Sequence, residues 1–82
     1  MEQIARTSKQ LGAVIRRRRR TVGLSQAQLG AKIRLRQATV SALEKGEPGT
    51  QLRTLIDVMT ALDLEMVVRE RSKAAVNIED VF

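Results

Sequence analysis

The sequence predicts an all-α fold of four helices with one short C-terminal strand that pairs across a dimer. Apolar residues recur at helical spacing through most of residues 8–62, and two capping patterns mark helix starts. Near residue 64 the spacing changes to the alternation of period two that is typical of a strand. A lone strand leaves its backbone hydrogen-bonding groups unpaired, so we expect a second copy of the chain to supply its partner.

The first helix is expected to begin after Thr7, because Gln10 lies three residues later and completes a capping box. Gly23 should end this helix, since glycine takes the left-handed backbone conformation that closes a helix without strain. A second capping box, from Ser25 to Gln28, starts the second helix at once. The apolar face of the first helix consists of Leu11, Val14, Ile15 and Val22, and that of the second consists of Leu29 and Ile33.

A three-residue turn, 34–36, leads from the second helix into a short polar helix expected over residues 37–44. Two helices joined in this way form a helix-turn-helix, whose second member places its N-terminal residues in the major groove of DNA. Gln37 can pair bidentately with adenine, and Arg36 with guanine. The predicted base-reading residues are Arg36, Gln37, Ala38, Thr39 and Ser41, and the predicted buried residues of this helix are Val40 and Leu43.

Charge and capping together predict where DNA phosphates would bind. The backbone amides of a helix's first turn point outward, so Ser25 and Gln26 are candidate phosphate contacts, and Arg19 is counted with them. Residues 1–46 carry eleven Lys and Arg against two acids, whereas residues 47–82 carry four against seven. The basic front half suits a polyanion, and the mildly acidic rear half is free to meet another protein.

The fourth helix is expected to start with Thr50 as its N-cap, after a turn at residues 47–49. Its apolar stripe consists of Leu52, Leu55, Ile56, Met59 and Leu62. One short chain cannot cover this stripe, so the strand at residues 64–71, paired across a two-fold axis, is expected to close over it. The predicted dimerisation residues are Leu64, Met66, Val67 and Val68.

The composition argues against most enzymatic chemistry. The chain has no histidine, cysteine, tyrosine or tryptophan, so it lacks the usual general base, thiol nucleophile and nitrogen or sulfur metal ligands. We therefore expect a binding protein that is not an enzyme and uses no metal and no cofactor. No apolar run approaches the roughly 20 residues that span a membrane, and the N-terminus lacks the layout of a signal peptide. The cytoplasm is the expected location, with no membrane partner.

The stretches Gly23–Leu29 and Gln37–Gly46 resemble the helix-turn-helix of the lambda-repressor/Cro-type (XRE) family, and this resemblance covers residues 8–62. More narrowly, Arg36–Ser41 and Leu62–Met66 resemble HipB-type antitoxins. The resemblance implies a lambda-repressor-like domain that forms a homodimer through a C-terminal strand. It also implies that the dimer binds a palindromic operator in double-stranded DNA, represses its own operon and neutralises a HipA-type serine/threonine kinase toxin.

The resemblance further implies roles for single residues. Gln26 and Lys45 would contact phosphate, and Arg19 would form a structural ion pair with Glu44 at the end of the third helix. The sequence departs from the family pattern at Arg34, where glycine is usual, and it offers no good N-cap for the third helix. The backbone at Arg34 either avoids the left-handed region or takes it at some cost.

Five consecutive arginines occupy positions 16 to 20 of the first helix, where they step around the cylinder and cannot all do one job. Arg18 falls on the apolar face, where its stem can cover the edge of the core while its guanidinium reaches out. Arg16, Arg17 and Arg20 are interpreted as a solvated face that strengthens nonspecific attraction to DNA. An arginine-rich RNA-binding segment is the alternative interpretation of this run.

We divide the chain into a flexible arm (1–7), a DNA-binding and dimerisation domain (8–71) and a disordered tail (72–82). Phe82 is the one aromatic residue, and it is either part of a frayed terminus or an anchor that inserts into a partner's pocket. The favoured function is that of a repressor and antitoxin. The alternatives are a stand-alone phage-type repressor without a toxin and a general RNA- or polyanion-binding protein.

Overall fold

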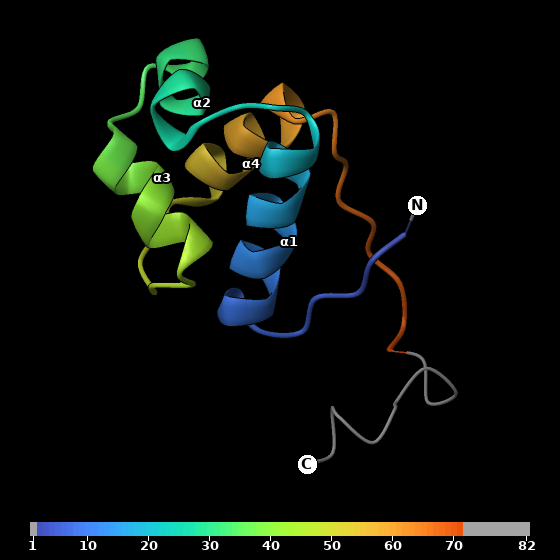
Figure 1. Ribbon diagram of the computed structural model, residues 1–82. Coiled ribbons are helices and arrows are strands. Elements are labelled where there is room, and N and C mark those ends of the chain that lie inside the picture. Colours follow the sequence, from blue (N-terminus) through green and yellow to red (C-terminus); the bar gives the residue numbers. More distant parts are fainter. Residues whose placement is uncertain (1, 72–82) are drawn as a thin grey trace.

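The computed structural model describes residues 2–71, and Figure 1 shows them as a small bundle of helices. In chain order the helices are α1 (Ser8–Thr21), α2 (Gln26–Ile33), α3 (Gln37–Glu44) and α4 (Leu52–Ala61). The predicted all-α class is confirmed, as are the expected bounds of α3. No helix in this part of the chain is long and apolar enough to cross a membrane.

Both predicted capping patterns start helices. At α1 the hydroxyl of Thr7 accepts a hydrogen bond from the amide of Gln10 at 3.0 Å. The Gln10 side chain accepts from the amide of Arg6 at 2.6 Å, one residue earlier than the expected box. At α2 the box is complete, because Ser25 Oγ accepts from the amide of Gln28 at 3.0 Å and Gln28 Oε1 accepts from the amide of Ser25 at 2.8 Å. These bonds satisfy amides that a helix start otherwise leaves unpaired.

The turn between α2 and α3 uses an arginine in a glycine-like conformation. Arg34 has φ 58° and ψ 40°, so it takes the left-handed region at a cost of about 1–2 kcal/mol. The turn folds back over α2, where the amide of Leu35 donates to the carbonyl of Gly30 at 2.8 Å. A Cβ at Gly30 would lie 2.5 Å from the carbonyl oxygen of Leu35, so only glycine lets the turn close this tightly. Arg36 precedes α3 without a side-chain cap, as expected.

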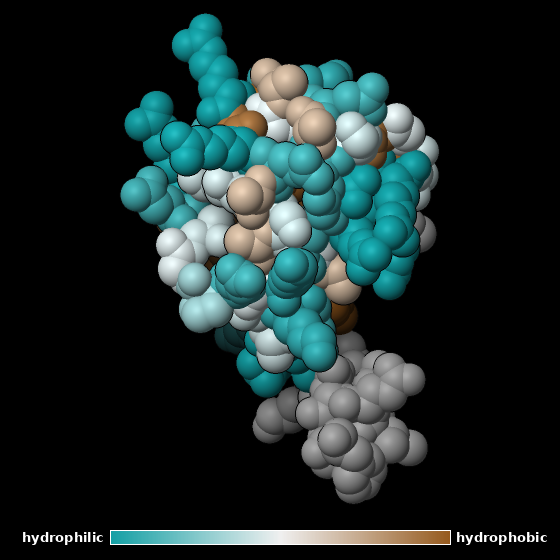
Figure 2. Space-filling view, turned by 60° about the vertical axis from the view of Figure 1, so that its left-hand side comes forward, coloured by the Kyte–Doolittle hydropathy of each residue, from teal (hydrophilic) through white to brown (hydrophobic). Residues whose placement is uncertain are grey.

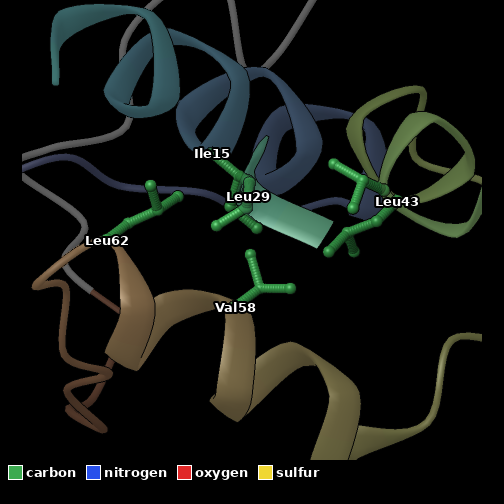
Figure 3. Packing of buried hydrophobic residues seen from close by; sticks show 6 residues of the cluster. Ile15, Leu29, Leu43, Val58 and Leu62 are labelled. Atoms are coloured by element: carbon green, nitrogen blue, oxygen red, sulfur yellow. The ribbon is translucent and has the colours of Figure 1, made fainter. Parts of the chain in front are cut away.

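One apolar core joins the four helices, and Figure 3 shows its side chains meeting between α1, α2, α3 and α4. The buried residues of this cluster are Ile15, Leu29, Val40, Leu43, Val58 and Leu62. Predicted core residues that pack against it while partly exposed are Leu11, Ile33 and Leu55. The expectation that Val22 shares this core is wrong, because Val22 is the C-cap residue of α1 and is 42% exposed.

The predicted face of α4 is correct on one side and wrong on the other. Met59 and Leu62 are buried as expected, and Val58, which was not expected to be, is fully buried beside them. Leu52 and Ile56 are 63% and 49% exposed, so this flank of the predicted stripe faces away from the core. Residues 56 and 58 lie on opposite flanks of the helix face that carries Met59 and Leu62. In the structure the flank of Val58 faces the core.

The start of α4 and the segment after it also differ from the prediction. The N-cap of α4 is Gln51 rather than Thr50, and its side chain makes no capping hydrogen bond. Residues 64–71 carry no strand in the single described chain, and Figure 1 shows them leaving the bundle on the side opposite α3. Pairing of this segment across a dimer therefore stays a prediction. The expected tail at 72–82 lies outside the described residues.

Candidate nucleic-acid interface

The starts of α2 and α3 lie next to each other on the surface. Gln26 is the first residue of α2 and Gln37 the first residue of α3. Gln37 Nε2 donates a hydrogen bond to Gln26 Oε1 at 3.4 Å. The structure thus brings the leading candidate for base reading into contact with the leading candidate for phosphate binding, although they are eleven positions apart in the sequence.

The surface of α3 is divided along the helix as a major-groove reader requires. Its inner face is buried through Val40 and Leu43, and its outer face is open. The exposed predicted base readers are Arg36, Gln37, Ala38 and Thr39, and Ser41 is half-buried. Figure 2 turns the left-hand side of Figure 1, where α2 and α3 lie, toward the viewer and shows a mostly hydrophilic surface. This face can therefore meet the polar edges of bases and the charged phosphates.

A buried ion pair locks α1 against α3. Arg19 Nε lies 2.6 Å from Glu44 Oε2, and Arg19 Nη2 donates to Glu44 Oε1 at 2.9 Å. The third nitrogen, Nη1, donates to the carbonyl of Leu24 at 2.8 Å. Arg19 and Glu44 are only 8% and 7% exposed. The geometry is the parallel two-bond arrangement that a guanidinium and a carboxylate favour.

This geometry leaves Arg19 in one of its two expected roles. It is the partner of Glu44, and each of its three guanidinium nitrogens is already engaged. A guanidinium that is buried with these partners has little surface left to offer to a phosphate. Its hydrogen bonding with Glu44 raises the pKa of Arg19, so the side chain stays charged. We therefore withdraw Arg19 from the phosphate contacts and keep it as a structural residue.

The carboxylate of Glu44 also reaches toward the surface through Gln26. Gln26 Nε2 donates to Glu44 Oε1 at 3.2 Å. Burial raises the pKa of Glu44, but the hydrogen bonds from Arg19 and Gln26, with the charges of Arg19 and Arg16, lower it on balance. Sequence reasoning did not foresee this link, because nothing in the local pattern relates Gln26 to a residue eighteen positions away.

The two remaining candidate phosphate contacts lie at the start of α2 and at the end of α3. Ser25 is exposed at the N-cap of α2, where its hydroxyl serves the capping box. Lys45 is exposed at the C-cap of α3, at the other end of that helix from Gln37. Arg16 was assigned only to the solvated face, but it lies near enough to Glu44 to lower the pKa of that carboxyl.

The other arginines of the run have distinct surroundings. Arg18 is half-buried, and its Nε donates to the carbonyl of Leu62 at 2.9 Å, so its stem crosses the core edge as expected. Arg17 donates to Gln3 Oε1 at 3.0 Å, and Arg20 is exposed. These contacts agree with the prediction that the five arginines have different roles.

The candidate dimerisation residues lie in the segment after α4. Leu64 packs against the core, whereas the next three apolar side chains are increasingly exposed, up to 93% for Val68. Arg69 forms an exposed ion pair with Glu2 at 3.1 Å, which ties this segment to the N-terminal arm. The predicted cover over α4 does not form within one chain, since Leu52 and Ile56 stay exposed. Phe82, the candidate partner anchor, lies outside the described residues.

Comparison with known proteins places these features in context. The chain matches the family model described as helix-turn-helix over residues 15–68. A solved structure described as a HipB-O4 20mer complex is 28% identical, with 87% of this chain and 100% of that chain covered and a TM-score of 0.80.

A structure of a HipA-HipB-O2-O3 complex gives 28% identity, coverage of 87% and 100%, and a TM-score of 0.79. The restriction-modification controller protein C.AhdI from Aeromonas hydrophila is 31% identical, with coverage of 71% and 84% and a TM-score of 0.65. No curated protein sequence matches the chain.

Proposed function

This chain belongs to the XRE-type helix-turn-helix family, and from that premise we propose that it is a sequence-specific DNA-binding repressor. The single observation that carries the proposal is the exposed polar start of α3, joined by a hydrogen bond to the start of α2. In a helix-turn-helix the start of the second helix meets base edges while the first helix crosses the backbone. The contact between Gln37 and Gln26 holds both in register for such a docking.

Each predicted base reader in α3 or at its N-cap has a base contact that suits its chemistry. Gln37 presents an amide that can read adenine, and Arg36 a guanidinium that can read guanine. The methyl group of Ala38 can touch the methyl group of thymine, and Thr39 and Ser41 offer hydroxyls as donors or acceptors. These five residues form the proposed base-reading set.

Phosphate binding is proposed around the same face. Ser25 and Gln26 lie at the start of α2 and Lys45 at the end of α3, and Arg16 is an exposed cation on α1. The net charge of +6 favours approach to a polyanion and makes the affinity fall with added salt. We propose a binding function rather than a catalytic one.

We further propose that the protein acts as the antitoxin of a HipA/HipB-type pair and works as a homodimer. Support comes from two HipB structures that match this chain over 100% of their own length, at TM-scores of 0.79 and 0.80. One of them is described as a HipA-HipB-O2-O3 complex and the other as a HipB-O4 20mer complex. The exposed apolar side chains of Met66, Val67 and Val68 support a second copy as the partner of residues 64–71.

A competition experiment tests the DNA-binding proposal. A palindromic duplex is first selected from a randomised duplex pool with the full chain. We expect a scrambled duplex and a structured RNA to compete poorly against it, and two chains to bind each palindrome. Equal competition by all three nucleic acids would favour a general polyanion binder and contradict the proposal.

A second test separates an antitoxin from a stand-alone regulator. The similarity to C.AhdI, a restriction-modification controller, favours the stand-alone alternative. An antitoxin gene is expected to adjoin a gene for a kinase-like protein. The two proteins should co-purify at a fixed ratio, and the kinase should be inactive in the complex. A neighbouring gene that encodes no kinase-like protein, or a kinase that stays active in the presence of this chain, would favour the stand-alone regulator.

A further inference from the structure

We propose that Arg18 of α1 is a positioning residue for dimerisation, because it fixes the point at which residues 64–71 leave the bundle. The proposal rests on the proposed homodimer, so the partner is a second copy of this chain. It is carried by a hydrogen bond between distant parts of the sequence, in which Arg18 Nε donates to the carbonyl oxygen of Leu62 at 2.9 Å. Leu62 is the C-cap residue of α4, so this bond joins α1 to the start of the segment.

The end of α4 holds the first residues of the segment in one conformation. The amide of Asp63 donates to the carbonyl of Thr60 at 3.1 Å, and the amide of Leu64 donates to the carbonyl of Met59 at 2.8 Å. Asp63 has a φ of 57°, and this left-handed residue turns the chain away from the helix axis. These backbone bonds are local to α4, so they fix the turn relative to that helix alone.

Arg18 supplies the hydrogen bond that ties this turn to α1. Leu62 is 1% exposed, so water has little access to its carbonyl oxygen. Within residues 2–71, Arg18 donates the one hydrogen bond that this oxygen accepts. An apolar side chain at position 18 could cover the edge of the core, but it would leave the carbonyl without a donor. A charged donor also makes a stronger bond than a neutral one, which suits Arg18 to this place.

A weaker contact holds the other end of the segment. Arg69 forms an ion pair with Glu2 at 3.1 Å, and Figure 1 shows the N-terminal arm crossing the segment. Arg17 donates to Gln3 of the same arm at 3.0 Å, so α1 also holds the arm. The ion pair is exposed, and an exposed pair changes an equilibrium by no more than roughly 5-fold. Arg18 therefore makes the stronger of the two contacts.

A second copy of the chain suits the segment between these two contacts. The apolar side chains of Met66, Val67 and Val68 are exposed in the described chain. Antiparallel pairing about a two-fold axis at Val67 would place Glu65 opposite Arg69 of the partner subunit. Opposite charges that face each other across two strands stabilise the pairing. The segment is thus complementary to itself in both its apolar and its charged side chains.

A segment that is held before it pairs needs less ordering when it pairs. Fixing the backbone of one residue weakens an association by roughly 5- to 30-fold. Both chains of a symmetric dimer contribute this loss, so freeing one residue in each chain should raise the dissociation constant by roughly 25-fold or more. Removal of Arg18 should therefore weaken dimerisation while the helices stay folded.

The experiment compares Arg18→Met with Arg20→Met in the full chain. Both variants remove one positive charge from α1, but Arg20 is exposed whereas Arg18 donates to Leu62. Sedimentation equilibrium should show the dissociation constant of the dimer raised by roughly 25-fold or more in Arg18→Met. Arg20→Met should stay within roughly 2-fold of the wild type, and Glu2→Gln should raise the constant by no more than roughly 5-fold. Equal dissociation constants for Arg18→Met and Arg20→Met would overturn the proposal.

A second variant separates the hydrogen bond from packing. Arg18→Lys keeps the charge but places a methylene where Nε lies, and its ammonium lies one atom further along the side chain. It should raise the dissociation constant by a smaller factor than Arg18→Met. A weaker dimer in Arg18→Lys than in Arg18→Met would show that packing sets the affinity, and would overturn the proposal.

A measurement on the monomer separates positioning from a general loss of stability. In the Val67→Pro background, which is expected to be monomeric, Arg18→Met should increase the mobility of the backbone amides of residues 65 and 66 in nitrogen-15 relaxation. The amides of α2 and α3 should stay ordered. Amides of residues 65 and 66 that are equally mobile with and without Arg18 would overturn the positioning role. A wild type that is monomeric at every concentration would instead overturn the homodimer on which the proposal rests.

Discussion

Replacing Arg19 by methionine should destabilise the fold far more than the same change at Arg20. Arg19 is 8% exposed and makes three hydrogen bonds, whereas Arg20, the next residue, is exposed. Removing one partner of a buried ion pair costs about 3–5 kcal/mol, because a charge is left buried without its partner. Gln26 would still donate to Glu44, so we expect a loss near the lower end, about 3 kcal/mol.

That loss is large against the total stability of a small domain, which is roughly 5–15 kcal/mol. In a domain of this size each kcal/mol corresponds to about 4–8 °C, so Arg19→Met should lower the melting temperature by about 12–24 °C. Arg20→Met should stay within about 0.5 kcal/mol of the wild type. The double variant Arg19→Met with Glu44→Leu should recover much of the loss, because an apolar pair leaves no buried charge.

Urea and thermal melts of these variants give the test, and the pH dependence adds a second readout. The folded-state pKa of Glu44 lies below its ordinary value of 4.5. Its contribution to stability is therefore present above that pH and is lost as the pH falls through the lower folded value. The wild type should lose stability relative to the double variant below pH 4.5. If Arg19→Met and Arg20→Met melt alike, the ion pair does not stabilise the fold and the reasoning is refuted.

Three further predictions concern packing, assembly and charge. A Cβ at Gly12 would lie 2.5 Å from the carbonyl oxygens of the last two residues of α3, so Gly12→Ala should cost about 1–3 kcal/mol or more in thermal melts. A Cβ at Gly23 would meet no atom within 4 Å, so Gly23→Ala should lower stability by only about 1–2 kcal/mol, the cost of its φ of 78°. A larger loss of stability at Gly23 than at Gly12 would contradict this packing. Val67→Pro removes a backbone donor from the predicted strand, so sedimentation should show monomers, and these should bind DNA poorly. An unchanged dimer would show that the strand does not form the interface. Lys45→Ala should weaken operator and scrambled duplex alike and lower the salt slope by about 1 per contact, and a loss confined to the operator would argue against a phosphate role.

Most of the helix boundaries followed from chemistry that acts over three or four residues. The N-cap at Thr7, the capping box at Ser25 and the left-handed Gly23 each depend on neighbours in the chain, so the pattern alone predicts them. The same reasoning left two conformations open at Arg34. It could not choose between them because the answer depends on how closely the turn approaches Gly30.

Features that depend on the partner surface were predicted less well. On α4 both Ile56 and Val58 flank the positions that face inward, and only the packing of the other helices decides which flank is buried. The contact between Arg19 and Glu44 was expected, but the extension from Glu44 to Gln26 was not. Such a link needs the spatial arrangement of three helices, which no spacing along the chain contains.

The central claim is that the exposed start of α3 reads a base, and Gln37→Ala tests it most directly. Binding isotherms of the wild type and this variant would be measured on the selected palindrome, on each single-base variant of it and on a scrambled duplex. We predict a loss of about 1–3 kcal/mol in discrimination at one base of each half-site, with the scrambled duplex bound as before. Equal losses for Gln37→Ala on the palindrome and the scrambled duplex would show that Gln37 reads no base and would contradict the account.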